Sequence, residues 1–288
     1  AMKRLWKQFQ GLSMHLKLVI SFSVPLVLIF SVLTWLGYRL LERNYMEQIR
    51  YSAEQSFEQA ASFLESHITN MMYMLERMDT DQELNTILTD GGFRTAADYG
   101  EQWRDYLELD HELMELELSN QLYRCAIYVP DELFYSGNGL HFFPESELES
   151  IPEKEEFRKK TEAGGCYITV SGEGRERVLV MLKLLKDGER KSGVARVSLA
   201  SGQIQTILEN TDVIRKGMSC LVSETGNILV ASADIQGEDS PEIPVSLASE
   251  EWERRKTGDG RTLLVRSREL GGSGIFLYSE VPKKEFYG

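Results

Sequence analysis

The stretch LVISFSVPLVLIFSVLTWLGY, residues 18–38, contains no charged side chain and lies between Lys17 and Arg39. A helix needs about 20 consecutive apolar residues to cross the hydrocarbon core of a bilayer. A single span must be helical, because lipid offers no partners for backbone N–H and C=O groups. Residues 18–38 therefore predict a transmembrane helix. The alternative, a cleaved signal peptide, has a shorter apolar region and a small-residue cleavage site, whereas YRLLERNY follows here.

The distribution of charge predicts the orientation of this single visible span. Every charged side chain in residues 1–17 is basic. Because basic flanks stay on the cytoplasmic side, we expect residues 1–17 in the cytoplasm and residues 40–288 outside the cell. All acidic residues lie in the remaining chain, and the net charge of the whole is −13. An acidic surface argues against nucleic acid or an anionic membrane face as a partner.

Residues 39–78 follow the span without a glycine or proline and predict a long stalk helix. Apolar or small residues recur there at spacings of three and four, which marks one helix face. The spacing is close to a heptad, so the face can pair with a second copy of the chain, or it can pack on the chain's own sheet. We expect pairing near the membrane, which predicts a homodimer of the intact protein, and packing at the far end. The face consists of Tyr45, Ile49, Ser52, Ser56, Ala60, Phe63, His67, Met71, Met74 and Met78.

After residue 78 the pattern changes to shorter helices and then to strands. Thr80 and Glu83 form a capping-box pattern for a short helix that ends near Leu88, and a further helix is expected over 98–118. Alternation of apolar and polar residues predicts the strands. The first set is expected at 122–129, 132–136, 166–171, 176–186 and 192–199, with 122–129 and 132–136 forming a hairpin.

A helix over 202–210 separates these strands from a second, smaller set. That set is expected at 217–223, 228–233, 261–270 and 274–281, with a helix over 246–256. The chain is therefore predicted to be an α+β protein with one transmembrane helix. Its larger helix-and-strand module covers residues 79–210, and its smaller strand module covers residues 211–288.

The sequence offers no recognisable catalytic or metal site. It lacks a G-x-S-x-G nucleophile elbow, and the cluster Asp110, His111, Glu112 and Glu115 does not have the HExxH spacing. We therefore expect no catalytic residue, metal ion or cofactor in this chain. The alternative is a membrane-tethered hydrolase. Cys125, Cys166 and Cys220 are too few for a disulfide framework; they are expected as small buried residues, with a Cys125–Cys166 bridge as the alternative.

The strands of the first set have an apolar face and a mixed face, because alternate side chains point to opposite sides of a sheet. The apolar face is expected to cover the long helix, and the mixed face to lie under the connection 137–165. Two arginines stand out there in an acidic chain, and a guanidinium binds carboxylate or phosphate. Tyrosine adds flat apolar area with a polar tip. A solvated face is the alternative to the predicted ligand site, which consists of Arg124, Tyr128, Tyr167, Thr169 and Arg196.

Three stretches resemble the extracytoplasmic double-Cache (dCache) sensor region of Gram-positive receptors, and most of all that of YesM-like sensor histidine kinases. The first is the apolar anchor with basic residues before it, which leads into NYMEQIRYSAEQSFEQAASFLESHITNMMYMLERMDTDQELNTIL, residues 44–88. The second is SGVARVSLASGQIQTILEN, residues 192–210, which is similar to the strand and helix between two Cache modules. The third is GIFLYSEVPKKEFYG, residues 274–288, which looks like the last Cache strand before a second membrane helix.

The resemblance implies two tandem PAS-like antiparallel-sheet modules, the membrane-distal one at 79–210 and the membrane-proximal one at 211–288. It further implies a two-component sensor that binds an extracellular small molecule and signals across the cell membrane to a histidine kinase portion that this chain does not contain. Double-Cache regions also precede chemoreceptor, cyclic-dinucleotide and AraC-type regulator outputs, which stay open. A membrane-anchored module that binds a protein instead of a small ligand is the remaining alternative.

Overall fold

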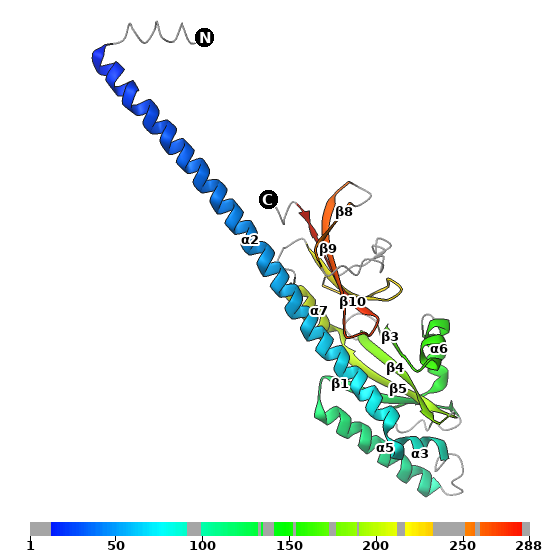
Figure 1. Cartoon of the computed structure of the whole chain (residues 1–288). Coiled ribbons are helices and arrows are strands. Elements are labelled where there is room, and N and C mark those ends of the chain that lie inside the picture. Colours follow the sequence, from blue (N-terminus) through cyan, green and yellow to red (C-terminus); the bar gives the residue numbers. More distant parts are fainter. Residues whose placement is uncertain are drawn as a thin grey trace. The chain divides into compact units, whose positions relative to one another are not determined.

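The computed structural model describes residues 13–90, 99–131, 134, 141–151, 154–172, 177–188, 190–211, 217–232, 251–256 and 260–283. Contacts between residues divide the chain into two units, which are described separately. The first unit contains residues 1–52 with 286–288, and the second contains residues 53–285. The helix α2, Met14–Thr80, contributes to both units and includes the predicted span and stalk (Figure 1).

In the first unit, α2 exposes apolar side chains along the predicted span. Phe22 is 72% exposed and Phe30 is 61% exposed. One helix in the described part of the chain is long and apolar enough to cross a membrane, and its apolar segment is not buried by protein. This length and composition agree with a membrane anchor. Pro25 lies inside the helix.

The second unit contains two five-stranded sheets. The first sheet has the strand order β2-β1-β5-β4-β3, and its neighbouring strands are antiparallel apart from the parallel pair β1 and β2. The expected hairpin partner of β1, residues 132–136, lies largely outside the described residues. The strands are β1 (Tyr123–Val129), β2 (Phe142–Pro144), β3 (Cys166–Ser171), β4 (Val178–Asp187) and β5 (Arg190–Ala200).

Helices cover both faces of the first sheet (Figure 1). The part of α2 after Ser52, α3 (Gln82–Asp90) and α5 (Tyr99–Ser119) share one apolar core with Cys125, Ile127 and the other side chains of that face. The opposite face is packed by η2 (Glu145–Ser150), a 3-10 helix, and by α6 (Lys154–Glu162). The expected coverage of each face, by the long helix and by the connection 137–165, is thus present.

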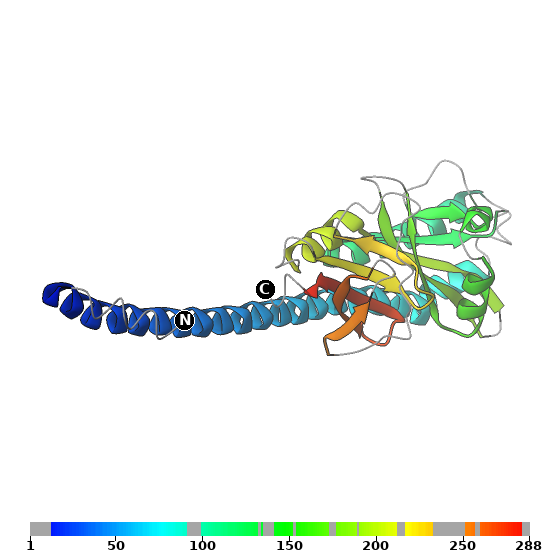
Figure 2. The ribbon, with the colours of Figure 1, turned by 90° about the horizontal axis from the view of Figure 1, so that it is seen from above.

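A second sheet follows α7 (Ser201–Thr211) and has the order β7-β6-β10-β9-β8, with every neighbouring pair antiparallel. Figure 2 shows its strands beside α2. One face adds Leu221, Leu277 and Ile275 to the core that contains α2. The strands are β6 (Met218–Ser223), β7 (Ile228–Ala231), β8 (Glu253–Lys256), β9 (Thr262–Glu269) and β10 (Ile275–Pro282).

Three local predictions need correction. Residues 253–256, expected in a helix, form β8 at the edge of the second sheet, where charged side chains suit an exposed strand; residues 246–250 lie outside the described part. The cap of α3 is Asp81, not Thr80, because Oδ1 of Asp81 accepts hydrogen bonds from the N–H groups of Glu83 (3.0 Å) and Leu84 (3.1 Å). The third correction concerns Cys166, which was expected to be buried but is only half-buried, whereas Cys125 and Cys220 are buried as expected. All three cysteines are free thiols, so the alternative Cys125–Cys166 bridge is absent.

The buried strip of α2 is also offset from the predicted face. Ala60, Met71, Met74 and Met78 are buried as expected, but Phe63 is 55% exposed. The buried strip includes part of the predicted face and also positions one residue away from it. The residues missed were Phe57, Leu64, Ile68 and Leu75.

Candidate ligand-binding site

The register of the first sheet places all five predicted site residues on one face. Tyr167 pairs with Leu182 of β4, which pairs with Arg196 of β5. Thr169 pairs with Val180 of β4, and Val180 pairs with Ser198 of β5. Ser198 in turn pairs with Arg124 of β1. Since directly paired residues share a face, the five side chains leave the sheet on the face where Tyr128 and Tyr167 pack with η2 and α6, although Arg124, at the start of β1, contacts α5 instead. They do not form one cluster.

Arg196 and Tyr128 are in direct contact. Nη1 of Arg196 donates to the hydroxyl of Tyr128 at 3.1 Å, and its guanidinium lies over the ring of Phe143, 5.2 Å from the centroid. Burial raises the pKa of Tyr128, and the adjacent Arg196 charge partly offsets this shift. Within the described part of the chain, half-buried Arg196 has no acidic partner. The guanidinium of Arg196 therefore lies beside two aromatic rings and has no ion-pair partner among the described residues.

Arg124 is already paired with a protein carboxylate. Its Nη1 lies 2.8 Å from Oε2 of Glu117 on α5, and its side chain is 72% exposed. The other carboxylate oxygen of Glu117 accepts a hydrogen bond from the N–H of Cys125 at 2.8 Å. This fixed carboxylate holds Arg124 at the start of β1, apart from the pair formed by Arg196 and Tyr128.

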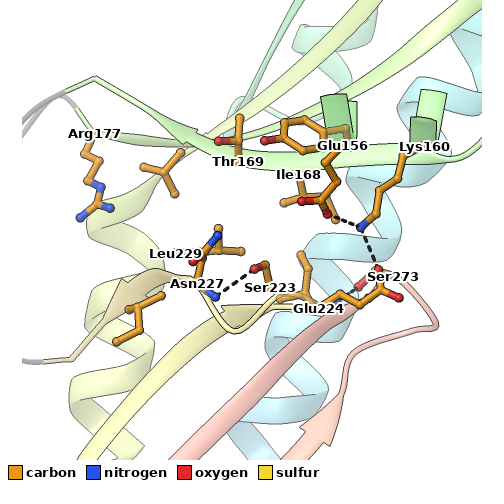
Figure 3. A pocket seen from close by; sticks show the side chains of 15 residues that line it. Glu156, Lys160, Ile168, Thr169, Arg177, Ser223, Glu224, Asn227, Leu229 and Ser273 are labelled. Atoms are coloured by element: carbon orange, nitrogen blue, oxygen red, sulfur yellow. Dashed lines mark hydrogen bonds and ion pairs between the residues drawn. The ribbon is translucent and has the colours of Figure 1, made fainter. Parts of the chain in front are cut away.

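Tyr167 and Thr169 line a cavity of about 190 Å³ between the two modules (Figure 3). The ring of Tyr167 packs edge-on against Phe157 of α6, with 5.6 Å between centroids. From the second module, the turn after β6 and the turn before β10 close the cavity with Glu224 and Ser273. Two of the five predicted residues thus belong to a cleft that involves both sheets.

An ion-pair network joins the two modules at one end of this cleft. Nζ of Lys160 lies 2.8 Å from Oε2 of Glu224 and 3.3 Å from Oε1 of Glu156. Burial lowers the pKa of Lys160, but its hydrogen bonds to Glu224 and Glu156 outweigh burial and raise that pKa overall. Figure 3 shows Arg177 at the opposite end of the cleft.

A second cavity, of about 410 Å³, lies between α2, β3 and the turn that joins β9 to β10. It shares Ile168 and Ser273 with the first cavity. Lys183 lines it and donates hydrogen bonds to Glu76 and, at 2.9 Å, to Asp79. Burial lowers the pKa of Lys183, but these hydrogen bonds raise it overall. This ammonium is therefore neutralised by α2, whereas Arg177 is not neutralised by any described residue.

The glycine-rich turn between β9 and β10 approaches α2 closely beside this second cavity. Gly271, Gly272 and Gly274 have φ values of +60°, +66° and +73°, a region that residues with a Cβ rarely adopt. A Cβ at Gly271 would lie 3.3 Å from Oγ1 of Thr69 on α2. The sequence identified this run as a turn, but its contact with α2 depends on distant residues.

The described residues include no group of three His, Cys, Asp or Glu side chains that could hold a metal ion. The acidic-and-histidine cluster of α5 is split. Nδ1 of His141 lies 2.6 Å from Oδ1 of Asp110, and its Nε2 lies 3.5 Å from Oε1 of Glu117, whereas His111 faces solvent and pairs with Glu115 at 3.5 Å. These groups link β2 to α5.

No protein-family model and no curated protein sequence matches this chain, but solved structures share its fold. The extracellular domain of soHK1S-Z6, assigned as a histidine kinase, is 14% identical with a TM-score of 0.52, over 87% of this chain and 98% of that chain. The ligand-binding domain of the Campylobacter jejuni chemoreceptor Tlp3, in complex with 4-methylisoleucine, is 11% identical with a TM-score of 0.50, over 84% of this chain and 93% of that chain.

A third similar structure is the extracellular domain of mmHK1S-Z3, also assigned as a histidine kinase. It is 14% identical with a TM-score of 0.50, over 82% of this chain and 96% of that chain. At these identities the likeness is one of fold. The chain therefore has an α+β fold with two sheets in tandem. Cache-like sensory domains of chemoreceptors and histidine kinases have the same fold.

Proposed function

We propose that this chain is the extracytoplasmic sensory region of a membrane receptor and that its first module binds a small molecule with an anionic group. In this proposal residues 79–210 are membrane-distal, residues 211–288 are membrane-proximal, and residues 18–38 anchor the chain. One observation carries the proposal: Arg196 is half-buried beside aromatic rings and has no acidic partner among the described residues.

A half-buried guanidinium normally has a carboxylate partner, because taking a charge out of water without one is costly. A ligand carboxylate or phosphate would supply that partner through charge-assisted hydrogen bonds. The rings of Tyr128 and Phe143 would exclude water from the ion pair. Arg124 would reinforce the site if a ligand displaced it from Glu117. Tyr167 and Thr169 would shape the end of the site that is formed by β3.

The output that we propose is a histidine kinase of the YesM-like kind, located in a portion beyond this chain, with the receptor acting as a homodimer. The three stretches at residues 44–88, 192–210 and 274–288 support this assignment. The shared fold supports a chemoreceptor equally, because solved domains of both classes match. In either case the ligand must bind two receptor conformations with different affinity in order to shift their populations.

The test is a thermal-shift screen of the full chain in nanodiscs against amino acids, organic acids, sugars and peptides. Amino acids come first, because the similar chemoreceptor domain is solved with 4-methylisoleucine and with L-norvaline. A ligand at a hundred times its Kd should raise Tm by about 5–10 °C. Arg196→Gln should abolish the shift, while Arg158→Gln, on an exposed position of α6, should retain it.

A shift that is equal in wild type and Arg196→Gln would place the ligand elsewhere and contradict the proposed site. A screen without any small-molecule ligand, together with capture of a specific protein by the full chain, would instead support the alternative of a protein-binding module. The first outcome would contradict only the location of the ligand site, whereas the second would contradict the binding of a small molecule.

A further inference from the structure

The cleft between the two modules has unpartnered polar groups on the side of the first module. The hydroxyl of Thr169 makes no hydrogen bond within the described part of the chain, and Arg177 has no acidic partner there. The backbone of Arg177 is nevertheless fixed, because its carbonyl accepts hydrogen bonds from N (3.1 Å) and Oγ (2.6 Å) of Ser201. The side chain of Arg177 is exposed, so its guanidinium is accessible to an anionic partner.

The opposite end of the cleft carries excess negative charge. Glu156 and Glu224 share the single ammonium of Lys160 (Figure 3). Two carboxylates against one ammonium leave one net negative charge at this end. The cleft thus presents a cation at one end and an anion at the other, and opposite charges attract complementary groups of a ligand.

The middle and the size of the cleft limit what can occupy it. Ile168 and Leu229 line the space between the charged ends, so the central part of an occupant should be apolar (Figure 3). The cavity volume is about 190 Å³. One water molecule takes up about 30 Å³ in the liquid, so the cavity holds roughly six waters or a molecule of about six to ten non-hydrogen atoms.

We infer that this cleft is a second ligand site, which binds a small linear zwitterion with a carboxylate at Arg177 and an ammonium at Glu156 and Glu224. Thr169 adds a hydroxyl beside the carboxylate, and the methylene chain lies on Ile168 and Leu229. The site is distinct from the one proposed at Arg196, which lies on β5. Because the ligand contacts β3 and α6 of the first module and the turn after β6 of the second, its binding strengthens the contact between the modules.

The experiment is calorimetric titration of the full chain in nanodiscs with β-alanine, δ-aminovalerate and ε-aminocaproate. Valerate and amylamine, which carry only one charge each, are the control ligands matched to δ-aminovalerate. We expect δ-aminovalerate to bind at least tenfold more tightly than either single-charge ligand, since each lacks one charge-assisted contact. Arg177→Gln should weaken δ-aminovalerate binding about tenfold or more, and Glu156→Gln should weaken it while leaving Lys160 paired with Glu224.

Three further variants make the test decisive. Arg158→Gln, on an exposed position of α6, should bind δ-aminovalerate as wild type does, and melting curves should show that all variants fold. Thr169→Val, which keeps the side-chain shape, should bind more weakly. Arg196→Gln removes the site proposed on β5, so δ-aminovalerate binding that persists in this variant belongs to the cleft. Normal binding by Arg177→Gln and Glu156→Gln, loss of binding in Arg196→Gln alone, or no binding of the whole ligand series would each overturn the proposal.

Discussion

Nη1 of Arg268 on β9 donates to Oε2 of Glu58 on α2 at 2.7 Å. The other carboxylate oxygen of Glu58 pairs with Arg266, and Nη2 of Arg268 reaches Glu65 at 3.1 Å. Arg266 is 7% exposed, its guanidinium lies 4.5 Å from the ring centroid of Phe57, and its Nε and Nη1 have no partner in the described part of the chain. Glu58 thus neutralises a buried arginine and ties the second sheet to the helix.

Removing the charge of Glu58 should destabilise the second unit. Glu58→Gln leaves the buried guanidinium of Arg266 without its carboxylate, which should reduce the free energy of unfolding by about 2 kcal/mol after allowance for the partial exposure of Glu58. Urea denaturation measures this change. Glu54→Gln, an exposed neighbour on α2, should change it by less than about 0.5 kcal/mol. Equal midpoints for the two variants would contradict the importance of this ion pair.

Gly193 should tolerate no side chain. A Cβ there would lie 2.9 Å from the carbonyl oxygen of Tyr128 and 3.3 Å from Cγ2 of Ile127, so Gly193→Ala must push β5 away from β1. We expect a loss of about 1–3 kcal/mol in the free energy of unfolding, measured by urea denaturation. At Gly202 on α7 a Cβ would meet nothing within 4 Å, and Gly202→Ala should stabilise by about 0.5–1 kcal/mol. Destabilisation of the same size in both would show that the close approach to β1 is not the cause.

His67 should make stability depend on pH. Its Nδ1 lies 2.7 Å from the hydroxyl of buried Tyr123, and burial lowers the pKa of His67 below its ordinary value of 6.5. The unfolded chain then binds a proton at a higher pH than the folded chain does. Stability is therefore complete above pH 6.5 and falls as the pH drops from there to the folded-state pKa.

The measurement is Tm at about pH 8 and at about pH 5. His67→Gln should lose less Tm on acidification than wild type does, because it removes the group that takes up the proton. His111→Gln is the matched control, since the side chain of His111 is 70% exposed; it should keep the wild-type dependence. Identical pH dependence in wild type and His67→Gln would refute a role for this histidine.

Impermeant maleimide labelling of intact cells tests the proposed topology. Arg158→Cys should be labelled, and Lys7→Cys should be labelled only after permeabilisation. The native thiols should give little background because Cys220 is buried, because burial and Glu117 raise the pKa of Cys125 to about 12, and because burial also raises the pKa of half-buried Cys166. The reverse labelling pattern would place the two modules in the cytoplasm.

Disulfide crosslinking of single cysteines along residues 45–63 tests the proposed homodimer. The exposed positions Tyr45 and Phe63 should crosslink in membranes, and efficiency should repeat about every 3.5 residues along the helix. Phe57, which is buried against the chain's own sheets, is the control and should not crosslink. A flat profile would remove this part of α2 from the proposed dimer interface.

The sequence by itself determined the elements that depend on local periodicity. An uncharged run of apolar residues predicted the exposed apolar part of α2, and period-two alternation placed Arg124, Tyr128 and Arg196 on one face of the first sheet. Successive side chains of a strand point to opposite faces of the sheet. The face of each side chain could therefore be inferred without knowledge of neighbouring elements.

The tertiary structure decided which of these residues meet. Tyr128 contacts Arg196, whereas Arg124 pairs with Glu117 and Thr169 lies in a cleft between the modules. The pairing of Lys160 with Glu224, the parallel partner of β1 and the offset of the buried strip on α2 all join residues far apart in sequence. Such contacts follow from how whole elements pack. A local sequence pattern does not show which distant side chain will contact a given residue.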